Sequence, residues 1–188
     1  MRQPLADMTN EELWQLFPIF LTPHRDCWVD WYVQEAHRIK TFLPLTEYRL
    51  SHIGSTAIRG IWAKPIVDIL LEVPQDASMA AIKDALTHNG YRCMCTEDAR
   101  MDFNRGYTES GFAERVFHLH LRFFGDCDEL YFRDYMNENP ALANQYEALK
   151  LSLWKRFEFD RDGYTAAKGD FIRLHTEAAK KKYGERYH

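Results

Sequence analysis

The stretch of sequence that decides the fold reads SHIGSTAIRG over residues 51–60 and KPIVDILLEV over residues 64–73. An apolar strand ends there at a turn of small residues, and a second apolar strand follows that carries one carboxylate within its apolar run, Asp68. Gly54 lets the backbone approach a bulky anion because it has no Cβ. The hydroxyls of Ser55 and Thr56 and the amides of the turn are suited to phosphate oxygens. With Asp68 across the gap, placed to hold a divalent ion, the pattern is typical of a nucleotidyl-transfer site.

The alternation of side chains along the second strand predicts where Asp68 points. One set of alternate residues is expected to face the helices, and the set that contains Asp68 faces the opposite side: Val67, Ile69, Leu71 and Val73 against Ile66, Asp68, Leu70 and Glu72. Burying an unpaired carboxylate costs several kcal/mol, so Asp68 needs a partner. Two interpretations stay open: a structural carboxylate bonded to Lys64 or to an amide, and a metal ligand or base.

A pair of histidines lies on a later strand, predicted over residues 116–124. His118, His120 and Arg122 share one face of it, and the apolar residues between them share the other. Both imidazoles of such a pair can reach a single ion, although a structural role for them is an equal alternative. His52, next to the small-residue turn, is expected to fix the loop rather than to ligate directly.

The last helices supply basic and aromatic residues. Lys150 follows Tyr146 by four positions and Lys168 follows Tyr164 by four, so each pair shares a helix face. Arg133 belongs to the same group. Such faces are either solvated surface or, if the helices pack beside the sheet, a source of phosphate contacts.

The remaining pattern predicts an α+β fold. Strands and helices are mixed up to about residue 125 and only helices follow, which favours a mixed sheet flanked by helices with a C-terminal helical lobe. We treat the chain of 188 residues as one domain, with a sheet core at about 22–125 and a helical lobe at about 126–188. The expected helices cover 11–17, 26–43, 54–64, 76–89, 130–138, 141–159 and 164–183; the expected strands cover 48–53, 65–73, 91–95 and 116–124; and 97–115 is expected to be a hairpin or a mobile loop.

Composition narrows the class of protein. Hydrophobic residues make up 46% and aromatic residues 14%, enough for a packed core. The net charge of −4 argues against a nucleic-acid partner, which usually meets a basic excess. The four cysteines form no CxxC pair and are expected to be reduced thiols. Because no signal peptide or membrane-spanning run is seen, we expect a cytoplasmic protein with no membrane partner.

In six blocks the chain resembles the GrpB family, a group placed in the nucleotidyltransferase superfamily typified by DNA polymerase beta. The resemblance covers about residues 22–184, most of the chain, and its blocks are His52–Thr56, Lys64–Ile69, His118–His120, Phe132–Tyr135, Tyr146–Lys150, and Tyr164 with Lys168 and Phe171. The resemblance implies a nucleotidyltransferase-like mixed sheet flanked by helices, with the Gly-Ser turn holding triphosphate and strand carboxylates holding Mg²⁺. The same kind of domain is found fused to some dephospho-CoA kinases, which points to nucleotide or coenzyme metabolism.

The chain also departs from the superfamily pattern. Two acids separated by one residue are expected on the strand, but Leu70 stands two residues after Asp68. Glu72 faces the same way and lies ~7 Å further along the strand. Ser51 takes the place of an acid before the turn, and Arg59-Gly60 replaces Pro-Gly.

Three functions are compatible with these residues. The first is transfer of a nucleotidyl group from an NTP to a small acceptor, with Mg²⁺ as cofactor and Asp68, His118 and His120 as catalytic residues. Asp68 and His120 are then the metal ligands, and the phosphate-binding residues are His52, Gly54, Ser55, Thr56, Lys64, Arg133, Lys150, Tyr164 and Lys168. The second is a non-catalytic module that binds a nucleotide or metabolite. The third is a metal-dependent hydrolase built on Asp68 and the histidine pair.

Overall fold

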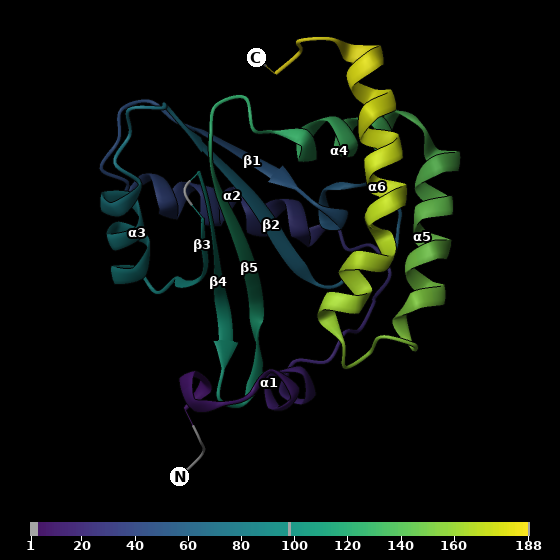
Figure 1. Cartoon of the computed structure of the whole chain (residues 1–188), viewed down its shortest axis with the longest axis horizontal. Coiled ribbons are helices and arrows are strands. Elements are labelled where there is room, and N and C mark those ends of the chain that lie inside the picture. Colours follow the sequence, from purple (N-terminus) through teal and green to yellow (C-terminus); the bar gives the residue numbers. More distant parts are fainter. Residues whose placement is uncertain (1–3, 98, 188) are drawn as a thin grey trace.

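The computed structural model describes residues 4–97 and 99–187, and within them five strands form one mixed sheet (Figure 1). The order across the sheet is β1-β2-β5-β4-β3. β2 and β5 run parallel, and the other neighbours are antiparallel. The strands are β1 (Arg49–Ile53), β2 (Ile66–Val73), β3 (Arg92–Glu97), β4 (Arg100–Thr108) and β5 (Gly111–Phe123). This confirms the α+β fold with a mixed sheet.

One face of the sheet is covered by α2 (Cys27–Lys40) and α3 (Met79–His88). The apolar set of β2 that was predicted to face helices lies in this core, with Val67 and Ile69 fully buried. Trp28 and Ile39 of α2 pack there because apolar residues recur along that helix at spacings of three and four. The predicted direction of the β2 side chains is therefore confirmed.

The other face of β1 and β2 is covered by the C-terminal helices, as expected of a helical lobe (Figure 1). These helices are α4 (Asp128–Glu138), α5 (Pro140–Trp154) and α6 (Arg161–Tyr183), and Pro140 occupies the first turn of α5. Leu70 of β2 is fully buried against Leu130 and Tyr131 of α4 and Ala179 of α6. The lobe therefore packs on the sheet face that also carries Asp68.

Two expectations about local structure need correction. Of the alternatives for residues 97–115, the hairpin is correct and the mobile loop is wrong, because β4 and the start of β5 fill this range. In β4, Met101 and Phe103 are buried and Asp102 between them points to the opposite face. This alternation is that of a half-buried strand, although the segment is largely polar. The helix expected over 54–64 is limited to the 3₁₀ turn η2 (Ser55–Ala57), because glycines with positive φ precede and follow it.

The N-terminal segment joins the two halves of the fold. It contains η1 (Leu5–Asp7) and α1 (Asn10–Leu16), and it then crosses to the C-terminal helices. The amide of Ile19 donates to the carbonyl of Glu158, and Thr22 pairs with Ala63. Within the described residues, none of the helices has the length and apolar character that a membrane crossing needs.

Candidate functional site

The centre of the site is the contact between Asp68 and the turn that follows β1. Asp68 pairs with Ile53 across β1 and β2, so the next residue, Gly54, lies against its carboxylate. Gly54 has a φ of 69°, which favours glycine, and a Cβ at this position would overlap Asp68 Oδ2. The glycine is therefore required both by the backbone conformation and by the space that the carboxylate takes.

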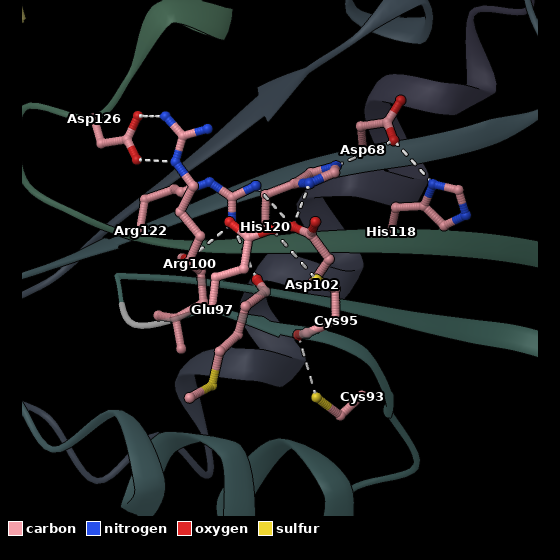
Figure 2. A network of polar contacts seen from close by, with 12 residues as sticks. Asp68, Cys93, Cys95, Glu97, Arg100, Asp102, His118, His120, Arg122 and Asp126 are labelled. Carbon is pink, nitrogen blue, oxygen red and sulfur yellow. Dashed lines mark hydrogen bonds and ion pairs between the residues drawn. The ribbon is translucent and has the colours of Figure 1, made fainter. Parts of the chain in front are cut away.

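The two histidines of β5 converge on Asp68, as the sequence predicted they could. His118 is in register with Asp68 and His120 with Leu70, one pair further along. His118 Nδ1 lies 3.3 Å and His120 Nε2 3.6 Å from Asp68 Oδ1. Figure 2 shows both rings directed at the one carboxylate. Asp68 thus obtains the partners that a buried acid needs from β5 rather than from Lys64.

A second carboxylate in the network, Asp102 of β4, was missed by sequence reasoning. It pairs with His120 across the sheet, accepts from His120 Nδ1 at 2.9 Å and accepts from Arg122 at 2.7 Å (Figure 2). The signal that could have found it is the alternation of buried Met101 and Phe103 with Asp102, the pattern of a half-buried strand.

The charges of this network are fixed by the contacts. Burial would raise the pKa of Asp68, but the hydrogen bonds from His118 and His120 outweigh it and hold that pKa well below its usual range. Burial would lower the pKa of His120, but its hydrogen bonds to Asp102 and Asp68 raise it to about 9. Burial would also raise the pKa of Asp102, which His120 and Arg122 nevertheless hold at about 2. His120 is therefore a cation between two carboxylates at neutral pH.

The network continues from His118 to the C-terminal lobe. The hydroxyl of Tyr107 lies 2.8 Å from His118 Nε2, and Arg161, the first residue of α6, donates to that hydroxyl at 2.9 Å. Burial lowers the pKa of His118 in spite of Asp68, so this ring is neutral at pH 7. Tyr107 and Arg161 were not singled out from the sequence, because each belongs to a segment with no recognisable motif.

The lysines predicted to bind phosphate gather around two buried tyrosines. Lys64 Nζ lies 5.4 Å and Lys168 Nζ 4.2 Å from the ring centre of Tyr164, and Lys150 Nζ lies 4.8 Å from that of Tyr146. Burial, together with the nearby cations, lowers the pKa of Lys64 and of Lys150 to about 7. Burial lowers the pKa of Lys168 to about 8, although Asp68 opposes this change.

The remaining predicted residues support the turn or the cavity. His52 is buried, stacks on Tyr32 and shares a hydrogen bond of 2.9 Å with Thr56 Oγ1. Burial lowers its pKa to about 4, so it is neutral at pH 7. Arg133 donates to the carbonyl oxygen of His52 at 2.8 Å. These contacts hold the backbone of the turn, while Ser55 reaches the Tyr146 hydroxyl.

A cavity of about 670 Å³ opens between this network and the C-terminal helices. Its walls combine the turn, the sheet and the inner faces of the lobe. They include Gly54, Ser55, Asp68, His120, Tyr146, Thr165 and Gly169. A volume of this size is within the range of small-molecule and cofactor sites.

The donor set does not fit a two-ion magnesium centre. Two-metal transfer requires ions about 4 Å apart bridged by carboxylates. Leu70 occupies the position of the second acid and packs in the core, while Glu72 is fully buried and paired with Arg49. Among residues 4–97 and 99–187, no group of three or more His, Cys, Asp or Glu side chains is arranged to hold a metal ion. At most one ion, on Asp68, is compatible with these residues.

Comparisons with known proteins agree with the resemblance seen in the sequence. The family model described as GrpB protein matches residues 18–178. A UPF0157 protein of Pseudomonas aeruginosa is 32% identical over 157 residues, which cover 82% of this chain and 64% of that protein. The crystal structure of conserved protein GrpB from Enterococcus faecalis gives a TM-score of 0.76 at 30% identity, covering 88% of this chain and 100% of the other.

A further match lies in a larger enzyme. A dephospho-CoA kinase of Mycolicibacterium paratuberculosis is 26% identical over 182 residues, which cover 83% of this chain but 44% of the kinase. The chain thus spans less than two thirds of the Pseudomonas relative and less than half of the kinase. This partial coverage agrees with the expectation of a domain that is fused to some dephospho-CoA kinases.

Replacing Gly54 by alanine tests the contact with Asp68. Gly60 also has a positive φ of 75°, but a Cβ there meets no atom within 4 Å, so Gly60→Ala is a matched control. We expect Gly60→Ala to cost about 1–2 kcal/mol for the left-handed backbone. Gly54→Ala should cost clearly more, because it must also displace a carboxylate that two histidines hold. Urea unfolding measures both; equal losses would contradict the proposed role of Gly54.

Replacing Asp102 by asparagine tests the charge of His120. In the wild type, NMR titration of the His120 ring should give a pKa of about 9, against an ordinary 6.5. Because this pKa is raised in the folded protein, the contribution of His120 to stability should be complete below pH 6.5 and lost as the pH rises through 9. Asp102→Asn should lower the pKa of His120, and Asp126→Asn, which removes the partner of Arg100, should leave it unchanged. A wild-type value near 6.5 would rule out the charged network.

Proposed function

The chain belongs to the GrpB family, and on that premise we propose that it binds the phosphate groups of a nucleotide or of another phosphorylated metabolite beside Asp68. The ligand would occupy the cavity between the sheet and the C-terminal helices. Its phosphates would lie toward the turn at Gly54 and toward Tyr146, a wall residue whose ring Lys150 contacts.

One observation carries this proposal: the lysines of the site have no carboxylate to neutralise them. Among the described residues, no acid lies within ion-pair distance of Lys64, Lys150 or Lys168, and Lys150 is 2% exposed and donates to the carbonyl of Trp62. Burying like charges together destabilises a fold unless an anion joins them. A phosphate group, which accepts several charge-assisted hydrogen bonds, is the ligand that such a group of cations favours.

The turn and the tyrosines would complete the phosphate site. The Gly54 backbone can approach an anion closely, and Ser55 offers a hydroxyl at the cavity wall. Tyr146 and Tyr164 place their rings under the ammonium groups, which orients those groups by cation–π attraction. His52, Thr56 and Arg133 would act by holding the turn in place.

A second candidate function is nucleotidyl transfer from an NTP, and the position of Asp68 at the wall of the larger cavity favours it. Mg²⁺ is commonly held by one or two carboxylates plus substrate phosphates, so Asp68 would hold one ion with the ligand's own oxygens. Such an ion would neutralise part of the negative charge of the phosphates. Neutral His118 donates from Nδ1 to Asp68, so its Nε2, which faces the Tyr107 hydroxyl, is the nitrogen that would take up a proton.

The geometry gives less support to a metal-dependent hydrolase. In His118 one ring nitrogen faces Asp68 and the other faces Tyr107. In His120 one ring nitrogen faces Asp68 and the other faces Asp102. A transition-metal ion would need a lone pair from at least one of these nitrogens. The ligation of such an ion would therefore require the network to be broken first.

One pair of measurements distinguishes the two favoured functions. Calorimetry with ATP in EDTA and in Mg²⁺, joined to an assay for pyrophosphate release, distinguishes a binding module from a transferase. Binding that is independent of Mg²⁺ without pyrophosphate supports the module. Pyrophosphate release that is lost in Asp68→Asn supports transfer. Because a relative is a dephospho-CoA kinase, coenzyme A precursors belong in the same ligand screen.

Replacing Lys168 by methionine should weaken phosphate binding and stabilise the free protein. Loss of one charged hydrogen-bond donor costs about 1.5–3 kcal/mol, so the Kd for tripolyphosphate should rise about tenfold or more. Removing a buried cation should raise the Tm of the free protein by about 2–4 °C, the effect of about 1 kcal/mol in a chain of this length. Lys181→Met, an exposed lysine on the same helix, should change neither. A lower Tm with unchanged affinity would contradict the proposed site.

The pH dependence of binding follows from the lysine pKa values of about 7 to 8. The terminal phosphate of ATP loses its last proton at about pH 6 to 7, so most of the change between pH 7 and 9 should come from the protein. We expect affinity for ATP in EDTA to fall over this range as the lysines lose their protons. The three lysines should make the free protein more stable over the same range, because a lowered pKa means that the unfolded chain binds more protons, and this gain should exceed the loss from the single raised pKa of His120. Affinity that rises from pH 7 to 9 would oppose the lysine site.

A further inference from the structure

A second, smaller cavity has Lys64 in its lining. It has a volume of about 320 Å³ and is bounded by the segment before α2, the start of β5 and the start of α6. In Figure 1, the β4–β5 turn and the start of α6 lie at the same end of the molecule as α1. Its lining residues are Pro18, Ile19, Phe20, Arg25, Lys64, Pro65, Ile66, Phe112, Ala113, Glu114, Val116 and Arg161.

The charges in this cavity favour a dianion. Arg25, Lys64 and Arg161 contribute three cations to the lining and Glu114 one acid. The Nε atom of Arg161 is buried and has no hydrogen-bond partner among the described residues, although its NH2 group donates to Tyr107. A buried donor of this kind normally has a partner, and the guanidinium that carries it belongs to a residue of the cavity lining. Guanidinium groups match phosphate oxygens in geometry as well as in charge.

The apolar part of the lining is suited to a planar ring. Phe20 and Phe112 lie with their ring centres 6.0 Å apart at the cavity, and Ile66 and Val116 form buried apolar wall. Glu114 is exposed at the rim, where its carboxylate can accept from hydroxyl or amino groups of a ligand. The cavity therefore joins an anion site to an aromatic wall within a volume near the lower limit of small-molecule sites.

We propose that this smaller cavity is a second ligand site, which takes a phosphate monoester carrying one planar ring, the class that includes nucleoside monophosphates. The inference rests on the proposed function in one respect: Lys64, which lines the smaller cavity, has a charge that interacts with Lys168 and Asp68. Arg161 makes a second link, through Tyr107 and His118 to Asp68. A ligand in the smaller cavity would thus place its phosphate next to the phosphate site of the larger one, as an acceptor must lie beside a donor.

The test uses residues that belong to the smaller cavity alone. Calorimetry with AMP should show binding that Arg25→Gln weakens about tenfold, while tripolyphosphate binding at the larger site stays unchanged. Arg25 is exposed, so this variant should fold normally. The matched control is Arg115→Gln. Arg115 is an exposed arginine of β5 that donates to Gln34 and is not part of the cavity lining, so this variant should leave AMP binding unchanged.

A second variant and two further ligands keep the result decisive. Ala113→Phe should fill the cavity and abolish AMP binding without removing a charge. If the site recognises both the ring and the phosphate, adenosine and inorganic phosphate should each bind at least tenfold more weakly than AMP. Equal binding of phosphate and AMP would overturn the ring site. No AMP binding, or AMP binding that is lost in Lys168→Met and retained in Arg25→Gln, would overturn the second site while leaving the first intact.

Discussion

One half-buried carboxylate, Asp68, sets the arrangement of the polar network on the sheet. Asp68 lies in an otherwise apolar strand, and the cost of burying its charge is met by His118 and His120 from the neighbouring strand. Each histidine then needs a second partner, which Tyr107 and Asp102 of β4 supply. The register of three strands is therefore tied to one charge, because a slip by one residue would turn every one of these side chains to the apolar face.

Lys64, Lys150 and Lys168, unlike Asp68, have no ion-pair partner among the described residues. They lie near Tyr146 and Tyr164, and burial lowers their pKa values more than the charges of Asp68 and Glu147 raise them. Groups arranged against stability are common where a ligand supplies the missing charge. Lys64 and Arg161 line the smaller cavity and connect it to the network around Asp68, which itself lines the larger cavity.

The departures from the superfamily pattern have a packing explanation. Leu70, at the place of a second acid, fills the core between β2 and the helices α4 and α6. A carboxylate there would be buried among apolar side chains unless the lobe moved away. Glu72, the other acid on this face, is fully buried and held by Arg49. In this chain the lobe is docked directly on the strand that carries Asp68, and this docking buries the position at which a second acid would stand.

The sequence by itself determined the features that depend on neighbouring residues. The α+β fold follows from the order of strands and helices, Gly54 from the turn that ends β1, and the inward direction of Asp68 and of the histidine pair from strand alternation. The tertiary structure decided the rest, because sheet pairing joins residues far apart in the chain. Asp102 meets His120 only through the β4–β5 register, and Arg161 meets Tyr107 only because α6 begins beside the end of β4. No local pattern encodes such contacts, since their partners are fixed by the packing of the lobe on the sheet.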